Sequence, residues 1–218
     1  AASGASGVSG YMVLSTGVSS KGNSGSMLLG SGVSTSGRGG KLSITVGSGD
    51  SGAGGDVIFT SGGTSDTIAT ATGGQIYMSG GTSASQTGGR ILIRSGVSTS
   101  KSSGSLGLVT SDSGTSGVSG FVVMSTGLST NGNSGSLYVG SGVASSGRGG
   151  SISVTVGSGN SGAGGELILS GGESIATGGR VVLQSGLSTT LSSGSLLVAT
   201  AASGASGVSG YMVLSTGV

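Results

Sequence analysis

Residues 25–56 read GSMLLGSGVSTSGRGGKLSITVGSGDSGAGGD and recur almost unchanged at residues 135–166 as GSLYVGSGVASSGRGGSISVTVGSGNSGAGGE. Residues 1–18 are identical to residues 201–218, so a second, outer repeat starts again at residue 201. Repetition at fixed periods is the signature of repeat architectures, in which each unit contacts mainly its neighbours. The sequence therefore predicts a stack of similar units.

A shorter repeat lies inside these units. Each copy begins with Gly or Ser followed by Gly, and the fourteen pairs start at 9, 24, 39, 54, 73, 88, 103, 119, 134, 149, 164, 178, 193 and 209. With this pair as positions one and two, the fourth position (Met12 to Met212) and the sixth position (Leu14 to Leu214) are sizeable and apolar in all copies. A spacing of two residues is typical of a β-strand, because alternate side chains share one face.

The pattern predicts an all-β fold, a parallel β-solenoid (β-helix) of flat, two-sided coils of about 15 residues, with 14 coils in the chain. Residues 1–218 would form one continuous solenoid with internal repeats 1–110 and 111–200, and residues 201–218 would begin the next copy. The fourth and sixth positions are expected to form the core, and 32–36 is expected to form a weaker second strand lined by Ser and Thr. A helix is disfavoured because every coil carries several glycines.

Composition excludes several classes of function. The 218 residues include 53 Gly and no Pro, Cys, His or Trp, and the net charge is only +2. Nucleic-acid binding needs clustered positive charge, whereas the eight Lys and Arg are scattered. A disulfide framework and a thiolate metal site both need cysteine. The apolar runs are far shorter than the roughly 18–20 residues of a membrane span. We therefore expect no nucleic-acid partner and no membrane span.

Two acidic residues in glycine-rich turns, Asp50 and Asp56, are the only weak candidates for a metal site. Glycine-rich repeats with aspartates bind Ca²⁺ in some parallel β-rolls. In the second half the equivalent residues are Asn160 and Glu166, and most coils carry no acid there. Because Ca²⁺ needs six to eight oxygen ligands, a repeating array of calcium sites is excluded.

The sequence offers nothing that indicates catalysis. Without His or Cys, an enzyme would need paired carboxylates or an activated Ser, and the acids fall mostly in turns. Residues 47–52 match G-x-G-x-x-G, but the helix that a dinucleotide site needs is missing after them. We expect no enzymatic activity, no cofactor and no small-molecule substrate.

The run GGSISVTVGSGNSGAGGE at 149–166 resembles Gly/Ser-rich repeat proteins of algal and other microbial genomes, and more loosely the stalks of bacterial repeat adhesins. The resemblance extends over the whole chain, although this coil is much shorter than those of adhesin stalks. It implies an extracellular or cell-surface, β-helical element that bears load or adheres. It brings no catalytic residues.

The fifth position predicts how the chain assembles. It lies between the two core columns, should point outward by strand alternation, and is nevertheless apolar in most coils. We call these residues the assembly row: Val13, Leu28, Ile58, Tyr77, Leu92, Val123, Tyr138, Ile168, Val182, Leu197 and Val213. A continuous apolar stripe marks an interaction surface.

The sequence thus predicts a structural repeat segment of a long extracellular filament, fibre or surface appendage. Its partners would be copies of itself, joined end to end through tandem repeats and laterally through the assembly row. An ice- or surface-binding solenoid with a flat Ser/Thr face is an alternative, although its hydroxyl positions are irregular. A receptor-binding adhesin stalk is another, which a separate tip domain would distinguish.

Overall fold

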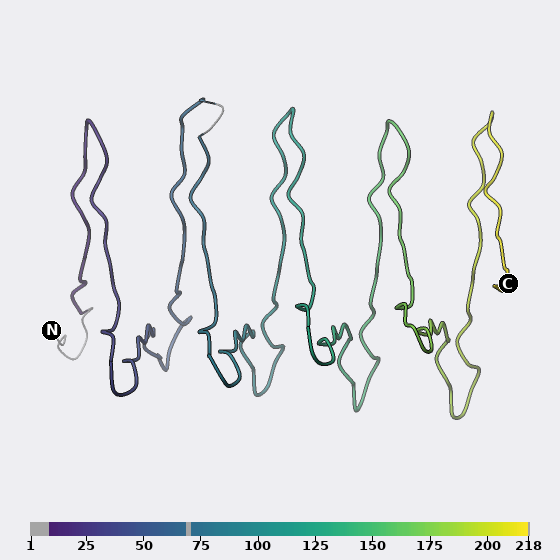
Figure 1. Ribbon diagram of the computed structural model, residues 1–218, viewed down its shortest axis with the longest axis horizontal. Coiled ribbons are helices and arrows are strands. Elements are labelled where there is room, and N and C mark those ends of the chain that lie inside the picture. The colour runs from purple at the N-terminus through teal and green to yellow at the C-terminus, as the bar shows by residue number, and fades with distance from the viewer. Residues whose placement is uncertain (1–8, 69–70, 218) are drawn as a thin grey trace. The chain divides into compact units, whose positions relative to one another are not determined.

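The computed structural model describes residues 9–68 and 71–217. Within these two ranges there is no helix and no β-strand, and Figure 1 accordingly shows a plain tube without coils or arrows. The predicted all-β fold, a parallel β-solenoid or β-helix, is therefore wrong. Since the described part contains no helix, it also offers none that could cross a membrane.

The chain is instead a string of short extended segments joined by closed loops (Figure 1). Each segment begins at the second position of the coil, always Gly, and ends at the eighth, which is Ser, Thr, Val or Gly. All fourteen have the same length: 10–16, 25–31, 40–46, 55–61, 74–80, 89–95, 104–110, 120–126, 135–141, 150–156, 165–171, 179–185, 194–200 and 210–216. The irregular spacing of the repeat therefore lies wholly in the loops, of which 172–178 is the shortest and 62–73 the longest.

Nine of the thirteen loops between the described segments are closed by a hydrogen bond where the end of one segment meets the first Gly of the next. The Thr16 hydroxyl donates to the Gly25 carbonyl at 3.1 Å, and the Ser31 hydroxyl donates to the Gly40 carbonyl at 2.9 Å. Equivalent side-chain hydrogen bonds join Ser61 to Gly74, Thr110 to Gly120 and Thr126 to Gly135. Backbone hydrogen bonds close four further loops, from Gly89 N to Gly81 O, Gly104 N to Gly96 O, Gly179 N to Gly172 O and Gly194 N to Gly186 O, and a fifth, from Gly74 N to Gly62 O, adds to the Ser61 closure.

These junctions explain why the solenoid does not form. In-register stacking of coils would pair residues one full coil apart, whereas the junctions join residues much closer in sequence, such as Thr16 to Gly25. Even across the longest loop, the joined residues Ser61 and Gly74 are closer in sequence than residues one full coil apart. Among the described residues, the hydrogen bonds involve no backbone group at the third to seventh positions of any coil. The segments therefore have the alternating side chains of β-strands, but no ladder of backbone hydrogen bonds joins them.

The expected second strand is also wrong, because 32–36 lies in the loop between two segments and the chain bends at 35–37. Small polar side chains build such loops rather than lining a core. The Ser98 hydroxyl accepts a hydrogen bond from Lys101 N at 2.9 Å, and Ser188 accepts the equivalent one from Leu191 N at 2.8 Å. Side chains of this kind commonly form local turns with nearby backbone amides.

The predicted core of fourth and sixth positions is wrong as well. In the described part of the chain no hydrophobic residue is buried. The accessible surface is 21658 Å², whereas a compact monomer of this 20.0 kDa mass would expose about 8,700 Å². The apolar side chains that the repeat places so regularly therefore have no partner within one chain.

The chain divides into two units, Ala1–Leu108 and Val109–Val218. Each unit has the same organisation of segments and closed loops. The first contains the long loop 62–73, and the second has the short loop 172–178 in the corresponding place.

One closure supplies a test of the junctions. A Cβ added to Gly89 would lie 2.8 Å from Gly81 N, whereas one added to Gly88 would meet only Gly81 O, at 3.5 Å. We expect Gly89→Ala to break the 2.8 Å hydrogen bond from Gly89 N to Gly81 O, because backbone atoms cannot turn aside. Hydrogen exchange of the residue 89 amide in assembled chains should then reach the rate of an unprotected amide. The control Gly88→Ala should leave that rate unchanged, and equal rates in both variants would contradict the closure.

Candidate assembly surface

The eleven residues of the assembly row all lie at the middle of an extended segment and are all exposed. Their exposed fractions range from 58% for Val182 to 90% for Leu28 and Tyr138. Water-exposed side chains of this size each forgo about 1.5–3 kcal/mol relative to full burial. The row is therefore a large unfavourable surface as long as a single chain is alone in water.

Within many segments the fifth position is more exposed than its two neighbours. Leu28 is 90% exposed, against 51% for Met27 and 68% for Leu29. Leu197 is likewise more exposed than Leu196 and Val198 on either side of it. Alternate residues of an extended chain point to opposite sides, so the fourth and sixth positions form a second apolar surface opposite the row. The eleven segments that carry a row residue therefore present apolar side chains on both faces, whereas Ser43, Gly107 and Ser153 occupy the fifth position in the other three.

An apolar hollow of about 480 Å³ lies in the first unit and is lined by Phe59, Ile76, Tyr77 and Met78. Phe59 comes from segment 55–61 and the other three from segment 74–80, so the long loop 62–73 brings two successive segments together here. Tyr77, a member of the assembly row, is the one residue of the row in this lining.

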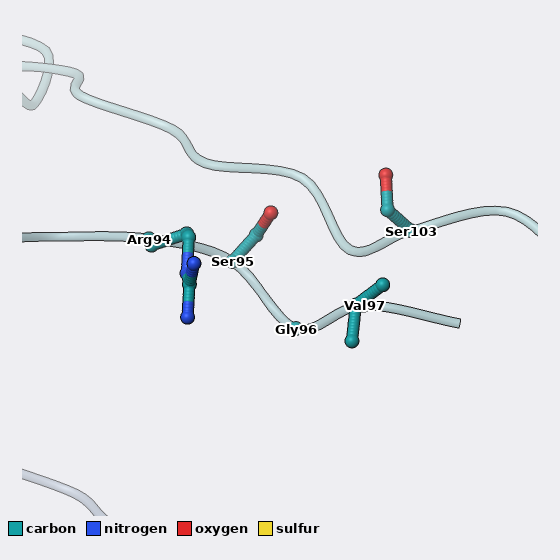
Figure 2. A pocket seen from close by; sticks show the side chains of 5 residues that line it. All are labelled: Arg94, Ser95, Gly96, Val97 and Ser103. Carbon is teal, nitrogen blue, oxygen red and sulfur yellow. The ribbon is translucent and has the colours of Figure 1, made fainter. Parts of the chain in front are cut away.

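A second hollow of about 680 Å³ lies inside the turn closed by Gly96 and Gly104 and is lined by Arg94, Ser95, Gly96, Val97 and Ser103 (Figure 2). It offers one guanidinium and two hydroxyl groups. None of the lining residues is buried, and in the second unit the residue equivalent to Arg94 is Gln184. The hollow is thus the inside of a loop, with no charged group held in place for a ligand.

The two metal candidates are in different parts of the architecture. Asp50 lies in loop 47–54, shortly before Gly52, which has a φ of 77°. Asp56 is the second residue of segment 55–61. In the part of the chain that the structure describes, no three His, Cys, Asp or Glu residues gather into a group that could hold a metal ion. The repeated turn itself is explained by glycine, since Gly162 has a φ of 76° where Asn160 replaces Asp50.

The junctions are a feature that the predictions missed. A Cβ at Gly55 would lie 2.8 Å from the Val46 methyl, and one at Gly165 would lie 2.6 Å from the Val156 methyl, so these two junction glycines allow an approach that a larger residue would crowd. The signal was present in the sequence. The apolar positions always keep the same distance from this Gly, whereas every variation in length falls between segments.

Comparisons with known proteins place the chain in no family: no family model, no curated protein and no solved structure matches it.

Proposed function

We propose that this chain is a structural, non-enzymatic repeat segment of an extracellular filament, fibre or surface appendage. It works by assembling with other copies of itself, laterally and through tandem copies of the unit that spans residues 1–200. The observation that carries the proposal is that every large apolar side chain of the described residues is exposed, in a pattern that repeats along the whole chain.

The area argument favours assembly over an isolated chain. The exposed surface exceeds that of a compact protein of this mass by roughly 13,000 Å², about eight times the roughly 1,600 Å² of a standard protein interface. Conformational entropy keeps a chain expanded unless burial offsets it. In a chain that is one-third hydrophobic, burial of the apolar surface can offset this entropy, but only once other copies cover that surface.

A filament role needs no catalytic or metal-binding side chains. The described residues bring no metal-ligating group together, and the sequence has no His or Cys. Small residues at the junctions and segments of constant length allow every repeat to adopt the same structure. The location outside the cell is supported by the resemblance of 149–166 to Gly/Ser-rich microbial repeat proteins.

The alternatives have less support. An ice-binding face needs hydroxyls in flat ranks, but Ser34 and Thr35 lie in a bent loop, and the Thr64 hydroxyl accepts a turn hydrogen bond from Asp66 N. An adhesin stalk would use the same repeat and differ only by a separate tip domain. No observation favours either over the filament.

Labelling of single cysteines tests the proposal, because the natural chain has none to interfere. We expect wild-type chains to sediment as large assemblies, and Leu28→Cys, Tyr77→Cys, Tyr138→Cys and Leu197→Cys to lose most of their thiol reactivity on assembly. The control is Val143→Cys, in loop 142–149, where the native residue is fully exposed and reactivity should persist. Four row thiols that stay reactive in the assembled state would contradict lateral packing, and chains that never sediment would contradict the function.

A further inference from the structure

The segments leave their backbone groups free as well as their side chains. Hydrogen bonds among the described residues are confined to junctions and loops, so the third to seventh positions of each coil display unpaired N–H and C=O groups. Backbone groups of this kind are strong donors and acceptors. An extended stretch with a free edge is a template for pairing with another chain.

The composition of the segments suits such pairing. Nine of the fourteen carry no charged residue, and the charges in the other five are Lys41, Asp56, Arg90, Arg94, Glu166 and Arg180. The chain has no Pro, and segments such as GFVVMST at 120–126 and GSLLVAT at 194–200 are rich in apolar residues. Segments of about six or seven residues with high β-propensity, low charge and no Pro are typical of intermolecular steric zippers.

We infer that each extended segment without a charged residue pairs edge to edge, in register, with the same segment of a second copy of this chain. This inference rests on the proposed self-assembly and states how it occurs. The hydrogen-bonded ladder lies between copies, and the chain itself keeps the closed loops described above. One face of each pair carries the assembly row, and the other carries the fourth and sixth positions.

A second copy is the partner that the chain itself indicates. Eleven of the fourteen segments carry a residue of the assembly row, so two copies in register match over most of their length. The sparse charges leave no strong field that would select a partner of different chemistry. The excess exposed area is also far larger than one folded domain docking at a single site would cover.

The register follows from the loops. Segments are all of one length, but loop 62–73 is longer than every other loop and loop 172–178 is shorter than every other. Alignment without offset places each loop beside an identical loop. A shift by one segment would set loop 62–73 beside a shorter loop and pull the flanking segments out of alignment.

Solid-state NMR on assembled wild-type chains measures the register directly. With ¹³C only at the carbonyl of Val198, in-register pairing places like labels about 4.8 Å apart in neighbouring copies. A label separation beyond about 6 Å would overturn the inference, since only the in-register arrangement gives the strand spacing between identical residues.

A matched pair of variants tests the same arrangement independently. Leu197 in segment 194–200 and Leu187 in loop 186–193 are 87% and 89% exposed. In-register pairing would set the lysines of Leu197→Lys one strand spacing apart, where like charges directly opposite are destabilising. We expect its critical concentration for assembly to rise about tenfold or more, and added salt to lower it again. Leu187→Lys should assemble like wild type, because loops can move apart.

The outcomes separate this inference from the proposed function. Assemblies that form with equal critical concentrations in both variants would overturn segment pairing and leave self-assembly standing. A wild-type chain that stays monomeric would overturn both.

Discussion

Lysine at three residues of the assembly row, in the variant Leu28→Lys/Tyr138→Lys/Leu197→Lys, is expected to abolish assembly at concentrations where the wild type assembles fully. Each side chain contributes about 1.5–3 kcal/mol when buried. Three of them together correspond to at least about a thousandfold rise in the critical concentration. Sedimentation of the variant over a concentration series measures the effect.

The chain provides a matched control for this variant. Leu128, Val143 and Leu187 are apolar and highly exposed like the three row residues, but they lie in loops. The triple variant Leu128→Lys/Val143→Lys/Leu187→Lys has the same added charge and loses similar apolar area. It should assemble close to wild type. Equal loss of assembly in both triple variants would show that charge or hydrophobicity in general, and not the row, controls association.

The periodicity of the chain could be read from the sequence, because it requires only that segments of the chain be compared with one another. The alternation of apolar residues likewise indicated extended segments, in which the fifth position differs in exposure from its neighbours, as at Leu28 between Met27 and Leu29. Alternation is a property of any extended chain. It does not say whether the backbone partners come from the same chain or from another, and pairing within the same chain was assumed when the solenoid was predicted.

The loop-closing contacts that stand in place of the solenoid could not be predicted from the sequence, for a physical reason. Loop closure is decided by whether a small side chain, such as Thr16 or Ser31, can reach the carbonyl of the next segment's first Gly. The same period fits a coil that climbs one strand spacing per turn equally well. Choosing between them requires the entropy of closing a loop such as 17–24 and the energy of a ladder, and neither can be read from a repeat. The predicted core was wrong for the same reason, because the columns of fourth and sixth positions form a core only if the coils stack.

The assembly row stays a prediction from the sequence. The assembly row follows from residue type at one position of the repeat and needs only the alternation of an extended chain. Asp50 and Asp56 had a motif that suits Ca²⁺, but the turn that contains Asp50 is explained by the conformation of Gly52, and Asp56 lies in segment 55–61. The junction glycines were missed because glycine was interpreted only as a turn residue, and its role in close approach depends on a neighbour such as Val46.

We expect the isolated chain to be far larger than a compact protein of its length. With no hydrophobic core among its described residues, a dilute single chain should be expanded, because nothing offsets its conformational entropy. An unfolded chain of 218 residues has a radius of gyration of about 51 Å, and a compact one has about 17 Å. Above the critical concentration the apolar segments become covered by other copies, and the scattering particles should grow without a compact monomer as an intermediate.

Small-angle X-ray scattering over a dilution series is the most direct test of the central claim, that the apolar segments are buried only against other copies. The account predicts a radius of gyration near the expanded value of about 51 Å in the dilute limit, and much larger assemblies at high concentration. A radius of about 17 Å that does not change with concentration would show that the chain builds a core by itself, and would contradict the account.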